Sequence, residues 1–110
     1  MHIKGQHNLT AILYDKKGKI LSIGKNSFVK THPLQSKYAN QAGLSEKIFL
    51  HAEIDAIVKC SDLSKAHRIL VTRYNKTGQP LLAKPCEICQ LALRHIGIKV
   101  IDYTVAETNP

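Results

Sequence analysis

The chain has 110 residues, of which 44% are hydrophobic and 22% are charged, and this composition predicts one globular domain over residues 1–110. No run of 18 consecutive apolar residues occurs, so we expect no membrane partner, and Met1–Gln6 lacks the apolar core of a secretory signal. Three cysteines are an odd number, which argues against a disulfide framework and favours a reducing, cytoplasmic location.

The net charge of +8 is distributed unevenly, with +6 of it in residues 1–50. A basic surface suits phosphorylated substrates or nucleic acid. Scattered lysines on a solvated surface explain the charge equally well, and Lys16, Lys17 and Lys19 lie in an expected turn, where lysine is common without a function. The chain has only two Phe and four Tyr, so the sequence shows no array of aromatic rings for stacking bases.

The amino-terminal part of the chain predicts a β-hairpin followed by a short helix. Strand-forming runs cover residues 9–14 and 19–24, and the turn-forming residues 15–18 separate them. The next regular segment is a helix over 35–42, which we expect to end at Gly43 because glycine favours the conformation that closes a helix.

The middle of the chain predicts a second helix and a buried strand. Apolar residues at helical spacing place the helix over 52–63. Asp55 and Lys59 are spaced as an i, i+4 ion pair, which we expect on the outer face of this helix. The continuous apolar run in 68–74 is typical of a central strand buried on both faces, and the turn-rich segment 75–80 follows it.

The last part of the chain predicts a helix over 86–96, a stop at Gly97 and a final strand over 98–103. Because strands and helices alternate, we expect parallel pairing in the second half and an antiparallel hairpin in the first. The predicted fold class is therefore α/β, a three-layer α-β-α sandwich with a mixed four-stranded sheet. In this fold the helices that start near residues 51 and 86 begin at the same edge of the sheet.

The most informative residues are the sequence HAE at positions 51–53 and PCEIC at 85–89. His51, Cys86 and Cys89 offer one imidazole and two thiolates, which zinc binds in tetrahedral geometry. Cys60 lies at helical spacing in an apolar segment, so we interpret it as core packing. Three ligands then remain, which favours a catalytic Zn2+ site with an open position, one zinc per chain.

Glu53 is a carboxylate that this metal site does not need as a ligand. Bound zinc lowers the pKa of its water to about 7, so a hydroxide becomes available at neutral pH. Glu53 is placed to carry protons as the general acid and base of such a reaction. A lone C-x-x-C motif also occurs in structural zinc sites and redox pairs, so the argument depends on both motifs together.

The order H-x-E and then P-C-x-x-C resembles the cytidine/deoxycytidylate deaminase superfamily, the zinc-dependent nucleobase deaminases, over roughly residues 8–104. The resemblance implies a cytidine-deaminase-like fold and the removal of an exocyclic amine from a base. It assigns each site residue a role: His51, Cys86 and Cys89 bind zinc, Glu53 shuttles protons, Asn26 contacts the sugar or base, and the N–H of Ala52 donates to the base carbonyl. Asn26 is also an ordinary turn residue.

Members of this superfamily usually add a fifth strand and a closing helix, and we expect the sheet here to lack both after the fourth predicted strand. The last strand is then an open edge that invites pairing with another chain. We expect either the tail, residues 106–110, or a contact in a homo-oligomer to cover this edge.

Three hypotheses follow for the function. The leading one is hydrolytic deamination of a cytosine nucleoside or nucleotide, a small-molecule substrate, by attack at C4 with release of ammonia, and Lys25, Lys30 or His32 are candidate partners of a substrate phosphate. The second is a base deaminase acting on single-stranded DNA or RNA. The third is a non-catalytic zinc-stabilised binding module, in which Cys60 or His32 closes the metal site as a fourth ligand.

Overall fold

The computed structural model describes residues 9–106. These residues form one mixed sheet in the order β2-β1-β3-β4. Strand β1 is antiparallel to both β2 and β3, and β3 is parallel to β4. The predicted hairpin and the mixed four-stranded sheet are thus confirmed, with strand bounds at β1 (Leu9–Tyr14), β2 (Ile20–Lys25), β3 (Arg68–Arg73) and β4 (Val100–Tyr103).

The three helices are α1 (Pro33–Gln41), α2 (Ala52–Lys59) and α3 (Glu87–His95). All three were predicted, but α2 is shorter than expected, because Cys60 is extended and Asp62 caps a separate 3-10 turn, η1 (Leu63–Lys65). In the described part of the chain, no helix has the length and apolar character that crossing a bilayer requires.

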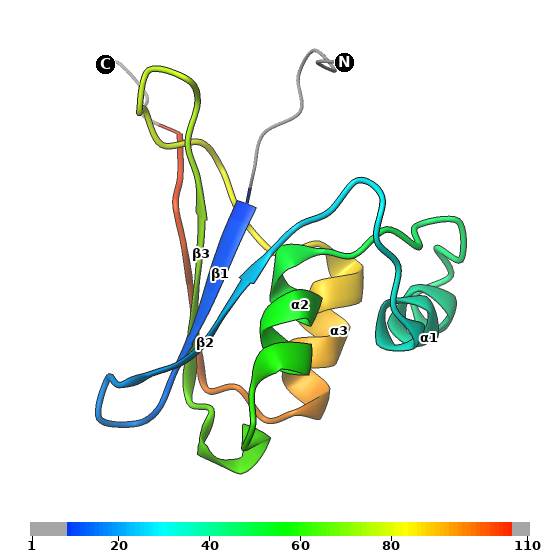
Figure 1. Ribbon diagram of the computed structural model, residues 1–110, viewed down its shortest axis with the longest axis horizontal. Coiled ribbons are helices and arrows are strands. Elements are labelled where there is room, and N and C mark those ends of the chain that lie inside the picture. Colours follow the sequence, from blue (N-terminus) through cyan, green and yellow to red (C-terminus); the bar gives the residue numbers. More distant parts are fainter. Residues whose placement is uncertain (1–8, 107–110) are drawn as a thin grey trace.

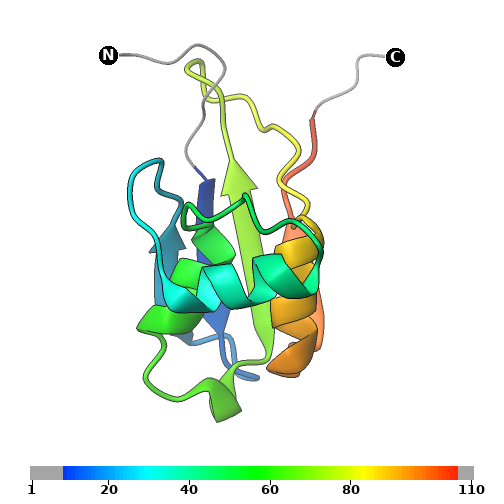
Figure 2. The same ribbon diagram turned by 90° about the vertical axis from the view of Figure 1, so that its right-hand side faces the viewer.

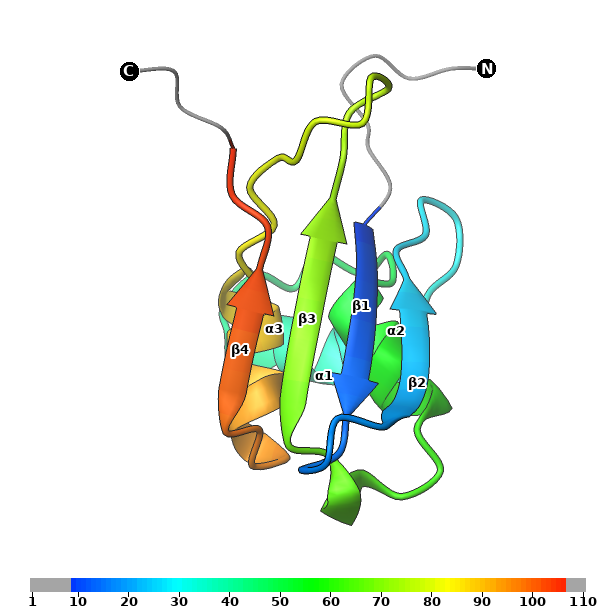
Figure 3. The same ribbon diagram turned by 90° about the vertical axis from the view of Figure 1, so that its left-hand side faces the viewer.

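The layers are the sheet, then α2 and α3 side by side, then α1, which runs across both of them (Figures 1 and 2). This differs from the expected α-β-α order, because no described helix covers the other face of the sheet (Figure 3). The connection from β2 to β3 and that from β3 to β4 both move the same way along the sheet. Crossovers of the same hand that advance in the same direction place their helices on one face.

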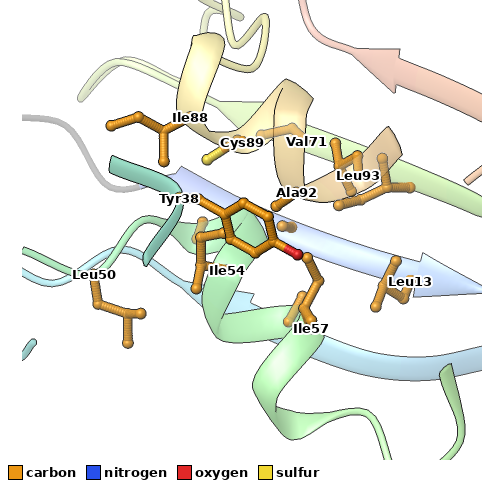
Figure 4. Close-up of a cluster of buried hydrophobic side chains, with 14 of the residues drawn as sticks. Leu13, Tyr38, Leu50, Ile54, Ile57, Val71, Ile88, Cys89, Ala92 and Leu93 are labelled. Carbon is orange, nitrogen blue, oxygen red and sulfur yellow. The ribbon is translucent and has the colours of Figure 1, made fainter. Parts of the chain in front are cut away.

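The core lies between the sheet and the helices, as Figure 4 shows for side chains from β1, β3, α1, α2 and α3. Strand β3 alternates rather than being buried on both faces as predicted: Ile69 and Val71 are fully buried, whereas Leu70 is half-buried. On the open face Leu70 pairs across the strands with Ile12, and Ile12 pairs with the exposed Ile23. The uncovered face of the sheet is therefore apolar at its centre.

Strand β4 is the outermost strand on its side of the sheet, with β3 as its partner among residues 9–106. Residues 107–110 of the tail that we expected at this edge lie outside the described residues, as does Met1–Gln6. That another subunit of a homo-oligomer covers this edge stays a prediction.

Helix α2 packs directly on β2 at Gly24. A Cβ atom at this position would lie 2.3 Å from the carbonyl oxygen of Ala52 and 2.2 Å from the nitrogen of Ala56. The Ser22 hydroxyl donates to the Ala56 carbonyl at 2.7 Å and holds the same contact. Asp55 pairs with Lys59 at 2.7 Å as predicted. Its carboxylate is nevertheless buried against β2 and not on the outer face.

We expect Gly24→Ala to lower the free energy of unfolding by about 3 kcal/mol, because the added methyl group meets helix backbone that cannot move independently. Gly18→Ala is the matched control, since a Cβ there meets nothing within 4 Å and only the φ of +88° opposes it. That strain costs about 1 kcal/mol. Urea denaturation compares the two variants, and an equal or smaller loss for Gly24→Ala would contradict this account of the packing.

Candidate metal centre and adjoining pocket

Two helix amino-termini form the candidate metal centre. His51 is the N-cap residue of α2 and Cys86 is the N-cap residue of α3, and both are extended, with ψ of 154° and 174°. The two helices lie side by side on the sheet, so residues 35 positions apart meet at one end of it (Figure 1). Cys89 follows one turn into α3 and is completely buried. The sequence predicted this convergence.

The three predicted ligands are close enough to share one ion. The Nδ1 atom of His51 lies 3.4 Å from the Sγ atom of Cys86 and 3.4 Å from that of Cys89. Zinc bonds of about 2.3 Å to sulfur and 2.0 Å to nitrogen at tetrahedral angles separate the two kinds of ligand atom by about 3.5 Å. The donor set and its spacing therefore fit zinc.

Among the described residues, no fourth side chain joins this group. Cys60, one of the two proposed alternatives, is half-buried and packs against the hydrophobic core, as predicted. The other alternative was His32, whose Nδ1 accepts a hydrogen bond from the Leu34 amide at 3.0 Å and so caps α1. Three protein ligands leave one tetrahedral position for a small molecule.

The protonation states of His51, Cys86 and Cys89 depend strongly on one another. The pKa of Cys86 is lowered to about 4, mainly by its hydrogen bond with Cys89 and also by the neighbouring His51 ring. The pKa of Cys89 is raised, first by the same hydrogen bond and then by burial. The pKa of the His51 ring is raised by its hydrogen bond with Cys86. The site therefore stabilises one thiolate beside an imidazole, and a bound dication favours deprotonation of both thiols.

Glu53 lies in the first turn of α2, and its carboxyl group is within hydrogen-bonding reach of Cys89. It is 4% exposed, and burial raises the pKa of its carboxyl group above the ordinary value, with the negative charge of Cys86 acting in the same direction. A carboxyl group in such surroundings holds a proton near neutral pH more readily than a surface carboxyl group does. This is the environment that a proton shuttle requires.

An open pocket of about 550 Å³ adjoins the metal centre. Two loops form its walls. They are joined by hydrogen bonds from the Ser27 amide to the Leu50 carbonyl at 2.8 Å and from the Leu50 amide to the Lys30 carbonyl at 2.9 Å. The lining residues combine apolar side chains with a few polar ones: Leu9, Asn26, Ser27, Phe28, Glu46, Lys47, Phe49, Leu50, His51, Ala52, Lys84 and Cys86.

Both predicted substrate-binding residues line this pocket. The side-chain oxygen of Asn26 accepts a hydrogen bond from the Leu9 amide at 2.8 Å, so its remaining polar group is an amide donor. Ala52 is the first residue of α2, where the backbone N–H has no partner within the helix. Lys25, Lys30 and His32, our candidates for a phosphate contact, are not lining residues.

The lysines at the pocket are Lys47 and Lys84, which the motifs did not indicate. Lys47 is near enough to lower the pKa of His51. Neither residue carries a sequence signal beyond its charge, because loops bring both to the pocket. The closeness of Lys84 to the second motif, at Cys86, is the one hint that the sequence offered.

Gln35 is a residue of the site that the sequence did not reveal. It is fully buried in α1, where its side-chain nitrogen donates to the Lys47 carbonyl at 3.2 Å and its oxygen accepts from the His51 amide at 3.1 Å. A single side chain thus joins the pocket wall to the residue that offers the imidazole. A polar residue on the buried face of a short helix was the signal available.

No model of a known protein family matches the chain, and no curated protein matches it either. The interpretation of the site therefore depends on its geometry and chemistry.

We expect purified protein to bind one zinc per chain and Cys86→Ser to weaken zinc binding by more than about 100-fold, since losing a ligand exceeds the effect of losing a group that only orients one. Cys60→Ser is the matched control and should retain the wild-type affinity. Competition with a chromogenic chelator measures both. Equal affinities in the two variants would contradict the ligand set.

Gln35→Leu should lower the free energy of unfolding by about 2 kcal/mol, because it leaves the Lys47 carbonyl and the His51 amide without a partner. It should also weaken zinc binding by roughly tenfold, since the hydrogen bond that orients His51 is lost. Gln41→Leu, at an exposed position of the same helix, controls for the change in composition. Urea denaturation and zinc titration provide the measurements, and unchanged zinc affinity in Gln35→Leu would remove its orienting role.

Proposed function

We propose that the chain is a zinc-dependent hydrolytic deaminase of a cytosine nucleoside or nucleotide. The observation that carries this proposal is the combination of three metal-ligand side chains with a buried carboxyl group, Glu53, beside an open pocket. When bound there, zinc acidifies a water molecule and thereby supplies a nucleophile at neutral pH. The same arrangement supports the resemblance to the cytidine/deoxycytidylate deaminase superfamily.

Glu53 performs the proton transfers in the proposed reaction. Its carboxylate oxygen accepts a proton from the attacking water and passes it to the ring nitrogen next to C4. A second proton follows the same route to the exocyclic amine, which leaves as ammonia while C4 becomes a carbonyl carbon. Water is the only other reactant, so the products are the uracil compound and ammonia. The raised pKa of the Glu53 carboxyl group suits a residue that must hold the proton between these steps.

The pocket residues supply the substrate contacts. Phe28 and Phe49 offer apolar surface for a planar base. The side-chain amide of Asn26 and the N–H of Ala52 are donors for the sugar or the base carbonyl. Lys47 and Lys84 outnumber the single acid of the lining, Glu46, and this supports a substrate that carries a phosphate.

The two other hypotheses make different demands on the site. Deamination of a base in single-stranded nucleic acid needs the same chemistry, and the openness of the pocket to solvent between two loops favours it as a second candidate. A zinc-stabilised binding module needs a closed site, and the three-residue ligand group speaks against it.

We expect the purified, zinc-loaded protein to release ammonia from cytosine compounds and Glu53→Gln to reduce the rate by at least about 100-fold while keeping its zinc. Glu87→Gln is the matched control, because Glu87 lies between the two cysteines but is exposed. The assay compares cytidine, deoxycytidine, their monophosphates, adenosine and a single-stranded oligonucleotide. Full activity in Glu53→Gln would refute the assigned role, and no activity on any substrate would refute the proposed function.

A further inference from the structure

A second hollow lies at the opposite end of the sheet from the metal centre. Three connections that are distant in sequence meet there: the turn between β1 and β2, the segment from η1 to β3, and the segment from α3 to β4 (Figure 3). The hollow has a volume of about 510 Å³. Its lining residues are mostly basic or small: Asp15, Lys16, Lys17, Ser64, Lys65, Ala66, His67, Ile96, Gly97 and Lys99.

Four lysines, Lys16, Lys17, Lys65 and Lys99, surround this space and are all exposed. In residues 9–106 the two ion pairs are formed by other residues, so no described carboxylate lies within ion-pair distance of these ammonium groups. The sequence indicated only a run of lysines in one turn, whereas the fold adds Lys65 and Lys99 from two other segments.

The carboxylates in this region already accept hydrogen bonds from backbone amides. The carboxylate of Asp15 accepts hydrogen bonds from the amides of Lys17 and Lys19 at 2.9 and 2.8 Å, and the bond from Lys19 is the main cause of its lowered pKa. Asp62, near Lys65, accepts from the amide of Ser64 at 3.0 Å. These carboxylates shape the turns, so the hollow retains a net charge of +3 from its lining residues.

A surface lined by one sign of charge attracts ions of the opposite sign, so this hollow favours an anion. Two or more phosphates match the charge better than one. The lining residues include no Phe, Tyr or Trp, so the hollow has no ring on which a base could stack. Recognition would therefore depend on closely spaced phosphates and not on bases.

We propose that this hollow binds the phosphodiester backbone of a nucleic-acid strand. The site uses none of the residues of the metal centre, and it goes beyond the proposed deaminase function. Lysine ammonium groups on three separate connections contact successive phosphates, and binding is independent of base identity.

The test is fluorescence anisotropy with a labelled 12-nucleotide oligothymidylate, whose base has no amine to lose, and zinc-loaded protein at several salt concentrations. The double variant Lys65→Glu with Lys99→Glu should weaken binding at least tenfold. It should also reduce the slope of log affinity against log salt by about 1.4, which is the loss of two phosphate contacts to a single strand.

The matched control is the double variant Lys37→Glu with Lys76→Glu, which changes the net charge equally at exposed positions outside the hollow. We expect less than a twofold change in its affinity. An equal loss in both double variants would show a general charge effect and overturn the proposal, as would unchanged binding in the first variant.

Two further measurements separate the remaining outcomes. Inorganic triphosphate should displace the oligonucleotide only at much higher concentration. If it binds as tightly, the ligand is a small polyphosphate and the strand proposal is overturned. Ammonia release from a free nucleotide should be the same in wild type and in the Lys65, Lys99 double variant, so failure of this proposal and failure of the proposed function are distinguishable.

Discussion

The meeting of two helix amino-termini at one end of the sheet is the constraint on which the site depends. His51 and Cys86 each end an extended segment and start a helix, and the ring nitrogen of His51 lies 3.4 Å from both sulfur atoms. That contact requires α2 and α3 to lie side by side with their amino-terminal ends at the same end of the sheet. Gly24 allows α2 to approach β2, and the side-chain oxygen of Gln35 accepts a hydrogen bond from the His51 amide. Packing, and not the ligands alone, thus sets the geometry of the metal centre.

The sequence predicted every strand and helix and the three members of the metal group, because each depends on local pattern. Examples of such local patterns are the glycines that close two helices, Gly43 and Gly97, and the residues of the two metal motifs. The layer order could not be predicted from such patterns. It depends on the direction in which the two crossovers move along the sheet, and this becomes known only when β1 is placed between β2 and β3.

The residue roles that the sequence missed depend on long-range contacts. Gln35 bonds to residues 12 and 16 positions away, and Asp55 bonds to the amide of Lys25, 30 positions away, so neither role has a local signature. The lysine cluster also depends on residues that are distant in sequence. Its members come from three connections, and sequence spacing placed only Lys16 and Lys17 together. From the sequence alone, scattered lysines on a solvated surface explained the charge equally well.

The burial of Glu53 distinguishes a functional from a structural interpretation of the site. Burying a carboxyl group costs free energy unless it is hydrogen-bonded or paired. Glu53 is 4% exposed and has hydrogen bonds to its own backbone and to Cys89, but no described cation forms an ion pair with it. The candidate ligands are His51, Cys86 and Cys89, so a metal ion held by them does not need Glu53 as a further ligand. The burial of Glu53 beside the candidate ligands therefore supports the proposed role in proton transfer.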